Sequence, residues 1–77
     1  MYIVLEMQTT GDTTAILPPV GFTDLNVAYQ KYYQILSAAA VSKVPIHTAM
    51  IISPKGEVIR TDYFEHEEVV VETEVEE

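Results

Sequence analysis

The first apolar and polar positions of the chain alternate. Residues 2–8, YIVLEMQ, place Ile3, Leu5 and Met7 on one side of an extended chain and the other four residues on the opposite side. A period of two in residues that favour β-structure predicts a strand.

A second strand is predicted over residues 14–19, paired back on the first. Between them lies TTGDTT, where Gly11 and Asp12 provide the residue types of a tight turn. Pro18 and Pro19 end this strand, because proline has no N–H to donate to a ladder.

Residues 21–42 follow the period of a helix. At about 100° per residue, one apolar stripe lies within about 60° of Leu25. Thr23 is the predicted N-cap, and Phe22 and Val27 occupy the positions of a hydrophobic staple. The stripe contains Ala28, Tyr29, Tyr32, Leu36, Ala39 and Ala40.

Residues 44–53 and 56–66 predict a β-hairpin. Pro54 stands at the second position of the turn, and Gly56 stands where a left-handed residue closes a bulged loop. The predicted order is therefore ββαββ. We expect a single α+β domain over residues 1–66, with a four-stranded antiparallel sheet and one helix on one face.

The charge of the chain is concentrated at its C-terminus. Residues 1–64 hold five acidic and four basic side chains, whereas residues 65–77 hold seven Glu and neither Lys nor Arg. Four scattered cations do not form the basic patch that a nucleic-acid duplex requires, which excludes that partner. The charge density predicts that residues 67–77 form an acidic, disordered tail. The alternative is that their alternating VVVETEVE extends the last strand or adds to a neighbour's sheet edge, which the seven Glu oppose.

The composition favours self-association. The chain has 77 residues, is 48% hydrophobic and contains no Cys. A chain of this length buries about 60% of its unfolded surface, and neither a disulfide nor a thiolate-bound metal can add to its stability. We therefore expect a homo-oligomer. No apolar run approaches the roughly 20 residues of a membrane span, and no signal peptide is visible, so we expect a soluble protein of the reducing cytoplasm.

His47 is the first candidate for acid–base chemistry, because histidine titrates near neutral pH. It is either a proton shuttle or ligand contact, or a half-buried strand residue at an interface, bonded to a carbonyl. The second interpretation is favoured, since an enzyme would need His47 to converge with a carboxylate such as Asp62. His66 is too distant from His47 in sequence to form a local metal site with it. The three glycines are isolated from one another, which excludes a glycine-rich phosphate-binding loop. We expect no metal, no cofactor and no enzymatic activity.

Five tyrosines form a surplus of aromatic residues. Tyrosine suits interfaces and ligand walls, and with nearby cations it can hold a nucleotide-like ligand by stacking and charge. The alternative is that these rings form the rim of the core and dimer contacts. Tyr2 and Tyr63 are expected on the sheet face away from the helix. The candidate ligand-binding residues are Tyr2, Tyr33, Lys43, His47, Arg60 and Tyr63.

The segment YQKYYQILSAAAVSKVPIHTAMII (29–52), with the opening MYIVLEMQT, resembles a group of small phage- and prophage-encoded proteins of Gram-positive, gut-associated bacteria. The chain departs from their pattern at LPPVGFTD. The resemblance implies a phage origin and transfers no catalytic residue. The matching positions are Lys31, Tyr32, Leu36, 38–42, Val44, Pro45 and His47.

Two functions remain after these exclusions. The first is a non-enzymatic, oligomeric binding protein whose interface pockets hold a small anionic or nucleotide-like molecule. By analogy with other small phage proteins, it would sequester a nucleotide-derived immune signal of the host. The alternative is an accessory phage structural or protein-interaction module that docks a partner through its sheet face or its acidic tail.

Overall fold

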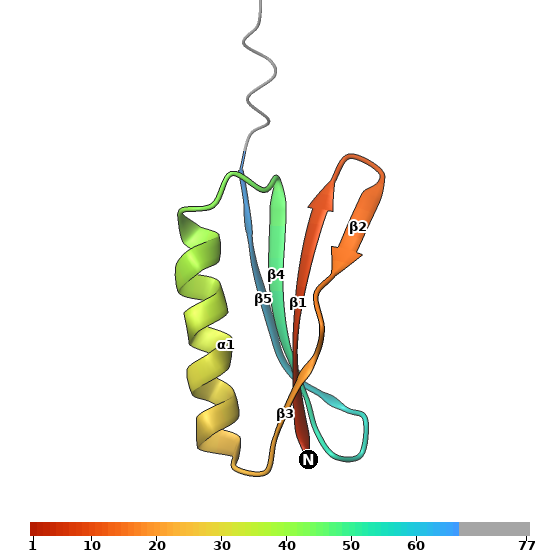
Figure 1. Cartoon of the computed structure of the whole chain (residues 1–77), viewed down its shortest axis with the longest axis vertical. Coiled ribbons are helices and arrows are strands. Elements are labelled where there is room, and N and C mark those ends of the chain that lie inside the picture. The colour runs from red at the N-terminus through yellow and green to blue at the C-terminus, as the bar shows by residue number, and fades with distance from the viewer. Residues whose placement is uncertain (67–77) are drawn as a thin grey trace, which may run out of the picture.

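One helix lies against one face of an antiparallel sheet in the computed structural model of the chain, which describes residues 1–66 (Figure 1). The predicted acidic tail, residues 67–77, lies outside the described residues. The elements are β1 (Tyr2–Thr10), β2 (Thr13–Ile16), β3 (Val20–Phe22), α1 (Leu25–Ala40), β4 (Ile46–Ile52) and β5 (Val58–Glu65). The α+β class and the single helix are thus confirmed.

The sheet has five strands, so the predicted count of four is wrong. Its order is β2-β1-β4-β5, and β3 also pairs with β1. The nine residues of β1 are long enough to pair with β2 at one end and β3 at the other, as in Met7 with Ile16 and Tyr2 with Phe22. The two prolines separate these short strands, because neither can donate a hydrogen bond.

Both predicted turns are confirmed. Gly11 has φ 60° between β1 and β2, and Gly56 has φ 88° between β4 and β5. In the second turn the Gly56 N–H donates to the Ser53 carbonyl at 2.9 Å. Side chains other than glycine rarely adopt these φ values, which explains why glycine stands at both positions.

The helix is shorter than predicted and begins after a different cap. Asp24, not Thr23, is the N-cap, and its side chain accepts a hydrogen bond from the Asn26 N–H at 2.8 Å. With this cap the predicted staple of Phe22 and Val27 is wrong, since both residues lie one position too early. Val27 is exposed, whereas Phe22 packs against the core.

The core lies between α1 and the centre of the sheet. The buried helix residues are Ala28, Tyr32, Ile35 and Ala39. Ala40 was predicted to lie on the apolar stripe but is exposed, whereas Ile35 was not placed on that stripe and is buried. Alternate strand residues meet them: Val4 on β1 and His47, Ala49 and Ile51 on β4.

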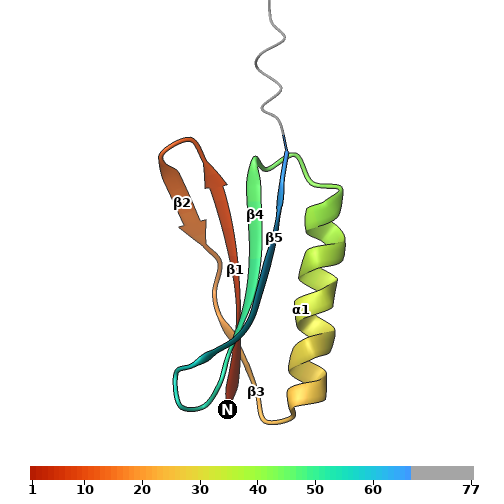
Figure 2. The same cartoon turned by 180° about the vertical axis from the view of Figure 1, so that it is seen from behind.

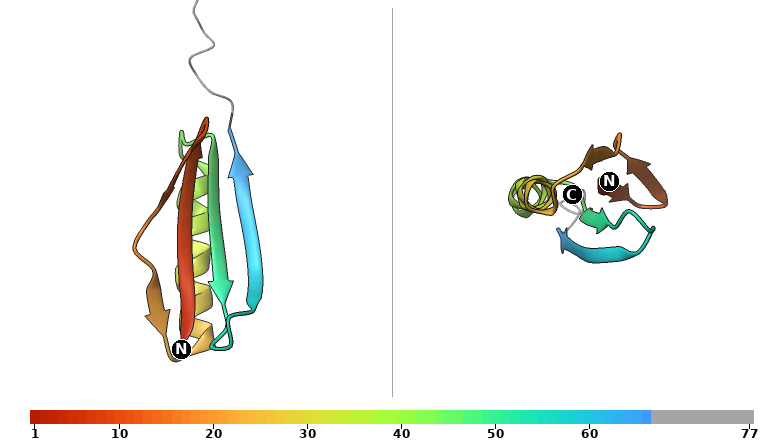
Figure 3. Two further views of the ribbon diagram at one scale, coloured as in Figure 1. Left: turned by 90° about the vertical axis from the view of Figure 1, so that its right-hand side faces the viewer. Right: turned by 90° about the horizontal axis from the view of Figure 1, so that it is seen from below.

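The opposite face of the sheet is not covered by any element among residues 1–66 (Figure 3). The helix stands beside the sheet in both side views, and the β1–β2 hairpin tip projects away from it (Figure 2). Register and alternation place a mostly apolar set on the uncovered side, which we call the helix-free face. It comprises Ile3, Leu5, Met7, Thr9, Ile46, Thr48, Met50, Ile52, Val58, Thr61, Tyr63 and Glu65.

Within residues 1–66, the helix is neither long enough nor apolar enough to cross a membrane.

Candidate functional site

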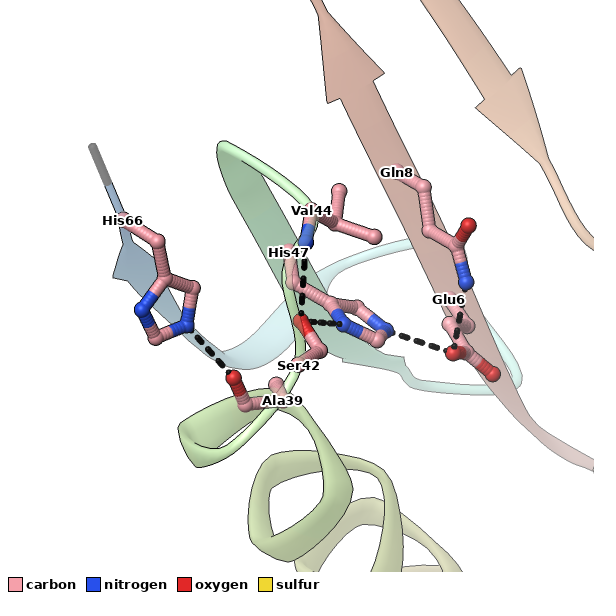
Figure 4. Close-up of polar contacts among 7 residues, drawn as sticks. All are labelled: Glu6, Gln8, Ala39, Ser42, Val44, His47 and His66. Atoms are coloured by element: carbon pink, nitrogen blue, oxygen red, sulfur yellow. Dashed lines mark hydrogen bonds and ion pairs between the residues drawn. The ribbon is translucent and has the colours of Figure 1, made fainter. Parts of the chain in front are cut away.

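A buried histidine joins three segments of the chain. His47 on β4 is 4% exposed, and its Nε2 lies 2.6 Å from the Glu6 Oε2 of β1 (Figure 4). Its Nδ1 lies 3.1 Å from the Ser42 Oγ, in the loop after α1. The Ser42 Oγ also accepts the Val44 N–H at 3.3 Å. We call Glu6, His47 and Ser42 the histidine network.

One hydrogen-bond direction in the histidine network follows from its partners. A carboxylate only accepts, so the His47 Nε2–H donates to Glu6, and Nδ1 forms the second hydrogen bond of the ring, with the Ser42 hydroxyl. Every polar atom of the imidazole is occupied. The network holds the loop after α1 against β4 and β1. A hydroxyl and a carboxylate on the two nitrogens of one imidazole is also the arrangement in which histidine acts as a base toward serine, but His47 is only 4% exposed, so a substrate has little access to it.

Local structure explains how these three side chains meet. α1 ends at Ala40, and the Val41 and Ser42 N–H groups still bond to the carbonyls of the last turn, which brings Ser42 back over the sheet. Glu6 and His47 point to the helix side of two adjacent strands, one alternating step apart in register.

The structure gives His47 partners that differ from those predicted. The predicted carbonyl partner is wrong, since the ring bonds to a hydroxyl and a carboxylate. The carboxylate is Glu6 and not Asp62, which is occupied elsewhere.

A second polar cluster joins α1 to β5. Tyr32 is fully buried, and its hydroxyl donates to the Asp62 carboxylate, to which the Arg60 Nε also donates at 3.1 Å. The hydrogen bond from Tyr32 and then the Arg60 guanidinium lower the pKa of Asp62. Burial, and then Asp62, raise the pKa of Tyr32. The cluster fixes the edge strand to the helix.

The lowered pKa of Asp62 predicts an acid-dependent loss of stability. A carboxyl whose pKa is lower in the folded state contributes stability above the unfolded pKa, about 4, and loses it as the pH falls through the folded value. Urea unfolding midpoints of the wild-type protein should therefore fall below about pH 4. The Asp62→Asn variant, which keeps an acceptor for Tyr32, should lose this part of the pH dependence. An identical acid profile in both proteins would contradict the assignment.

An aromatic and basic edge extends from this cluster. Tyr33 is 49% exposed, stacks on Tyr29 at 6.1 Å between ring centroids, and lies close enough to Arg60 to raise its pKa further, after Asp62. Phe64 stacks on His66 at 6.5 Å. The His66 Nε2 lies 2.8 Å from the Ala39 carbonyl, which lets it donate to the last turn of the helix.

No group of three metal-ligating side chains is found in the part of the chain that the structure describes.

The six predicted ligand residues do not form one surface. Tyr33 and Arg60 lie together at the edge described above, and Lys43 lies exposed in the loop before β4. Tyr2 lies on the helix side, where it packs against the core, so its predicted place on the other face is wrong. Tyr63 lies on the helix-free face as predicted, opposite Thr48.

Glu6, Ser42 and Tyr32 were missed as polar partners. Glu6 is separated from His47 by 41 residues, and Tyr32 from Asp62 by 30. One signal was present for Glu6, since a carboxylate within a β-rich segment requires a partner when it is partly buried.

Comparisons of the chain with known protein families, with curated proteins and with solved structures find no match. The residues and their geometry therefore carry the functional argument.

Proposed function

We propose that the protein is a non-enzymatic, homo-oligomeric binding protein of phage origin that sequesters a small, nucleotide-derived immune signal of the host. The helix-free face is the observation that carries this proposal. The phage origin rests on the sequence resemblance.

The helix-free face supports association because it is apolar across the two central strands. Leu5 lies opposite Met50, and Ile3 lies opposite Ile52. Removing apolar surface from water stabilises a complex by about 25 cal/mol per Å² of area. A contiguous apolar surface of this kind is typical of an interface rather than of a solvated face.

The histidine network supports a role without catalysis. Its imidazole is only 4% exposed, so a substrate has little access to the ring. The other titratable cluster, around Asp62, is occupied by Tyr32 and Arg60.

A two-fold interface would supply the pocket for the ligand. A pocket of about 300 Å³ or more is difficult to form inside so small a domain, but it can form where two copies meet. Tyr63 is 59% exposed and lies on the helix-free face, so its ring would line such a seam and stack on a base.

Charge on the helix-free face should dissociate the oligomer. Met50→Lys places a cation at the centre of the apolar surface, whereas the control Val27→Lys makes the same charge change on the outer side of the helix. Light scattering after size exclusion should give a smaller mass for Met50→Lys than for the wild type and Val27→Lys, with unchanged circular dichroism. A wild-type monomer, or equal masses for both variants, would contradict association through this face.

Ligand capture can be measured by thermal stability. A ligand at 100 times its Kd stabilises the folded state by about 2.7 kcal/mol, which raises the Tm of a domain of this size by about 10 °C or more. We expect one member of a panel of nucleotides and cyclic nucleotides to produce such a shift. The absence of a shift with every nucleotide would remove the ligand from the proposal.

A further inference from the structure

One edge of the sheet ends in a long strand with no neighbour among residues 1–66. β5 has eight residues and pairs with β4 on one side, while Figure 3 shows its other side open. The opposite edge is formed by the much shorter β2 and β3. An open, long edge strand is a template for a further strand.

The backbone groups that face this open edge follow from the hydrogen-bond pattern. The His66 N–H donates to the Pro45 carbonyl at 2.7 Å, one step beyond the pair Ile46 and Glu65. Hydrogen-bonded pairs alternate along an antiparallel ladder, so Phe64, Asp62 and Arg60 also direct their N–H and C=O groups toward β4. The intervening Thr61, Tyr63 and Glu65 direct theirs toward the open edge.

The side chains of β5 combine features that oppose and features that favour pairing. Charges, proline and bulges protect an edge strand, and β5 has Arg60, Asp62, Glu65 and an irregularity at its beginning, but neither Lys nor Pro. Four large apolar side chains of the strand are exposed, which favours pairing: Val58 by 56%, Ile59 by 38%, Tyr63 by 59% and Phe64 by 41%.

We propose that β5 pairs in antiparallel orientation with β5 of a second copy of this chain, with Thr61 opposite Thr61 of the partner subunit on the two-fold axis. The pairing joins two sheets into one, with both helices on the same side.

Charge favours this register over the two registers whose axis lies one residue away, at Arg60 or at Asp62. A two-fold axis perpendicular to the sheet must pass beside one residue, which then faces itself. An axis at Arg60 or at Asp62 places two like charges in a non-hydrogen-bonded pair, where Cα atoms are only about 4.5 Å apart. An axis at Thr61 places Arg60 opposite the partner's Asp62, and does so twice.

The backbone agrees with the same axis. Thr61 directs its N–H and C=O outward, so the central pair is hydrogen-bonded. The next outward residue, Tyr63, lies level with the partner's Ile59, the extra residue at the irregularity of β5, so the regular part of the pairing is centred on Thr61. His66, where the described chain ends, is then about 33 Å from the partner's His66, beyond the screening length of about 10 Å.

This interface uses the edge of the sheet and not its helix-free face, so it stands independently of the proposed function. It also extends that function, because two helix-free faces become continuous across the joined edge.

A single introduced cysteine tests the register, since the chain has no cysteine of its own. In Thr61→Cys the two Cα atoms would lie about 5.5 Å apart, which is within disulfide range. The control is Tyr63→Cys on the same face of the same strand, for which the distance would be about 13 Å. Under mild oxidation we expect a covalent dimer of Thr61→Cys and little of Tyr63→Cys. Equal rates for the two variants would overturn the register.

The same cross-link separates the edge from the face. In a Thr61→Cys/Met50→Lys protein, the disulfide dimer should still form at an unchanged rate. Loss of the cross-link in this double variant would mean that face contacts had brought the cysteines together, and the edge pairing would be wrong. Failure of the proposed ligand binding would leave the cross-link unaffected.

Complementary charge variants test the ion pairs. Arg60→Asp and Asp62→Arg each turn two attractive cross-strand pairs into repulsive ones, which should raise the dimer dissociation constant about tenfold or more. Mixing the two variants restores both pairs, because the two carboxylates of one variant then face the two guanidinium groups of the other. A heterodimer should therefore form at near the wild-type affinity. A mixture that associates no better than either variant would overturn the proposal.

Discussion

Replacing Tyr32 with Ala is expected to remove about 3–5 kcal/mol of folding stability, the largest effect of any single substitution considered for this chain. Tyr32 is fully buried, and it packs edge-on against Tyr29 and Tyr33 at centroid distances of 6.3 and 5.2 Å. A domain of this length is stable by about 4–11 kcal/mol, so the variant should lose a large share of its free energy of unfolding. Urea unfolding followed by circular dichroism measures the loss.

Two variants separate the ring of Tyr32 from its hydroxyl. Tyr32→Phe keeps the packing and removes the hydrogen bond to Asp62, whose side chain is 45% exposed and can bond to water instead, so the cost should be about 1 kcal/mol. Tyr33→Ala removes the adjacent, half-exposed ring and should also cost about 1 kcal/mol. If Tyr33→Ala were as destabilising as Tyr32→Ala, the assignment of the core would be wrong.

Breaking the histidine network from one side should have the second largest effect. Glu6→Leu leaves the buried Nε2–H of His47 without its acceptor, which should cost about 2–3 kcal/mol. Glu6→Gln keeps an oxygen acceptor at the same place and should cost about 1 kcal/mol. Urea unfolding of each variant gives the two values.

A double-mutant cycle tests whether the two side chains act together. His47→Leu alone strands the Glu6 carboxylate, which is 20% exposed, whereas Glu6→Leu/His47→Leu leaves no unpaired partner. The double variant should therefore lose less stability than the sum of the single variants. Ser37→Ala changes a side chain on the exposed side of the helix and is the control substitution. Its free energy of unfolding should lie within about 0.5 kcal/mol of the wild-type value. Strict additivity would contradict a coupled network.

The proposals give three parts of the sheet different roles. The covered face and its two polar clusters hold the fold together, the helix-free face supports association and ligand capture, and β5 supports a specific two-fold contact. Arg60→Asp and Asp62→Arg also alter the polar cluster around Tyr32, so their dissociation constants are compared only where circular dichroism shows an unchanged fold.

Local chemistry determined much of the fold. Gly11 and Gly56 mark both hairpin turns because each adopts a positive φ that other residues avoid. The apolar period predicted α1 and three of its four buried residues, since a helix forms its own hydrogen bonds wherever it packs. These features depend on neighbours in the sequence and could be predicted from it.

Tertiary contacts decided the remainder. β3 is a strand only because β1 lies beside it, and three residues carry too little pattern to show this in advance. Glu6 and Asp62 bind partners that are 41 and 30 residues away in the sequence, a separation over which no local rule operates.

Tertiary contacts also determined which face of the sheet the helix covers. The side of β1 with Ile3, Leu5 and Met7 is more apolar than the side with Glu6 and Gln8, yet the helix covers the second, because Val4 packs in the core there and Glu6 binds His47. Alternation along a strand shows that two faces differ, whereas contacts between distant segments determine which of them the helix buries.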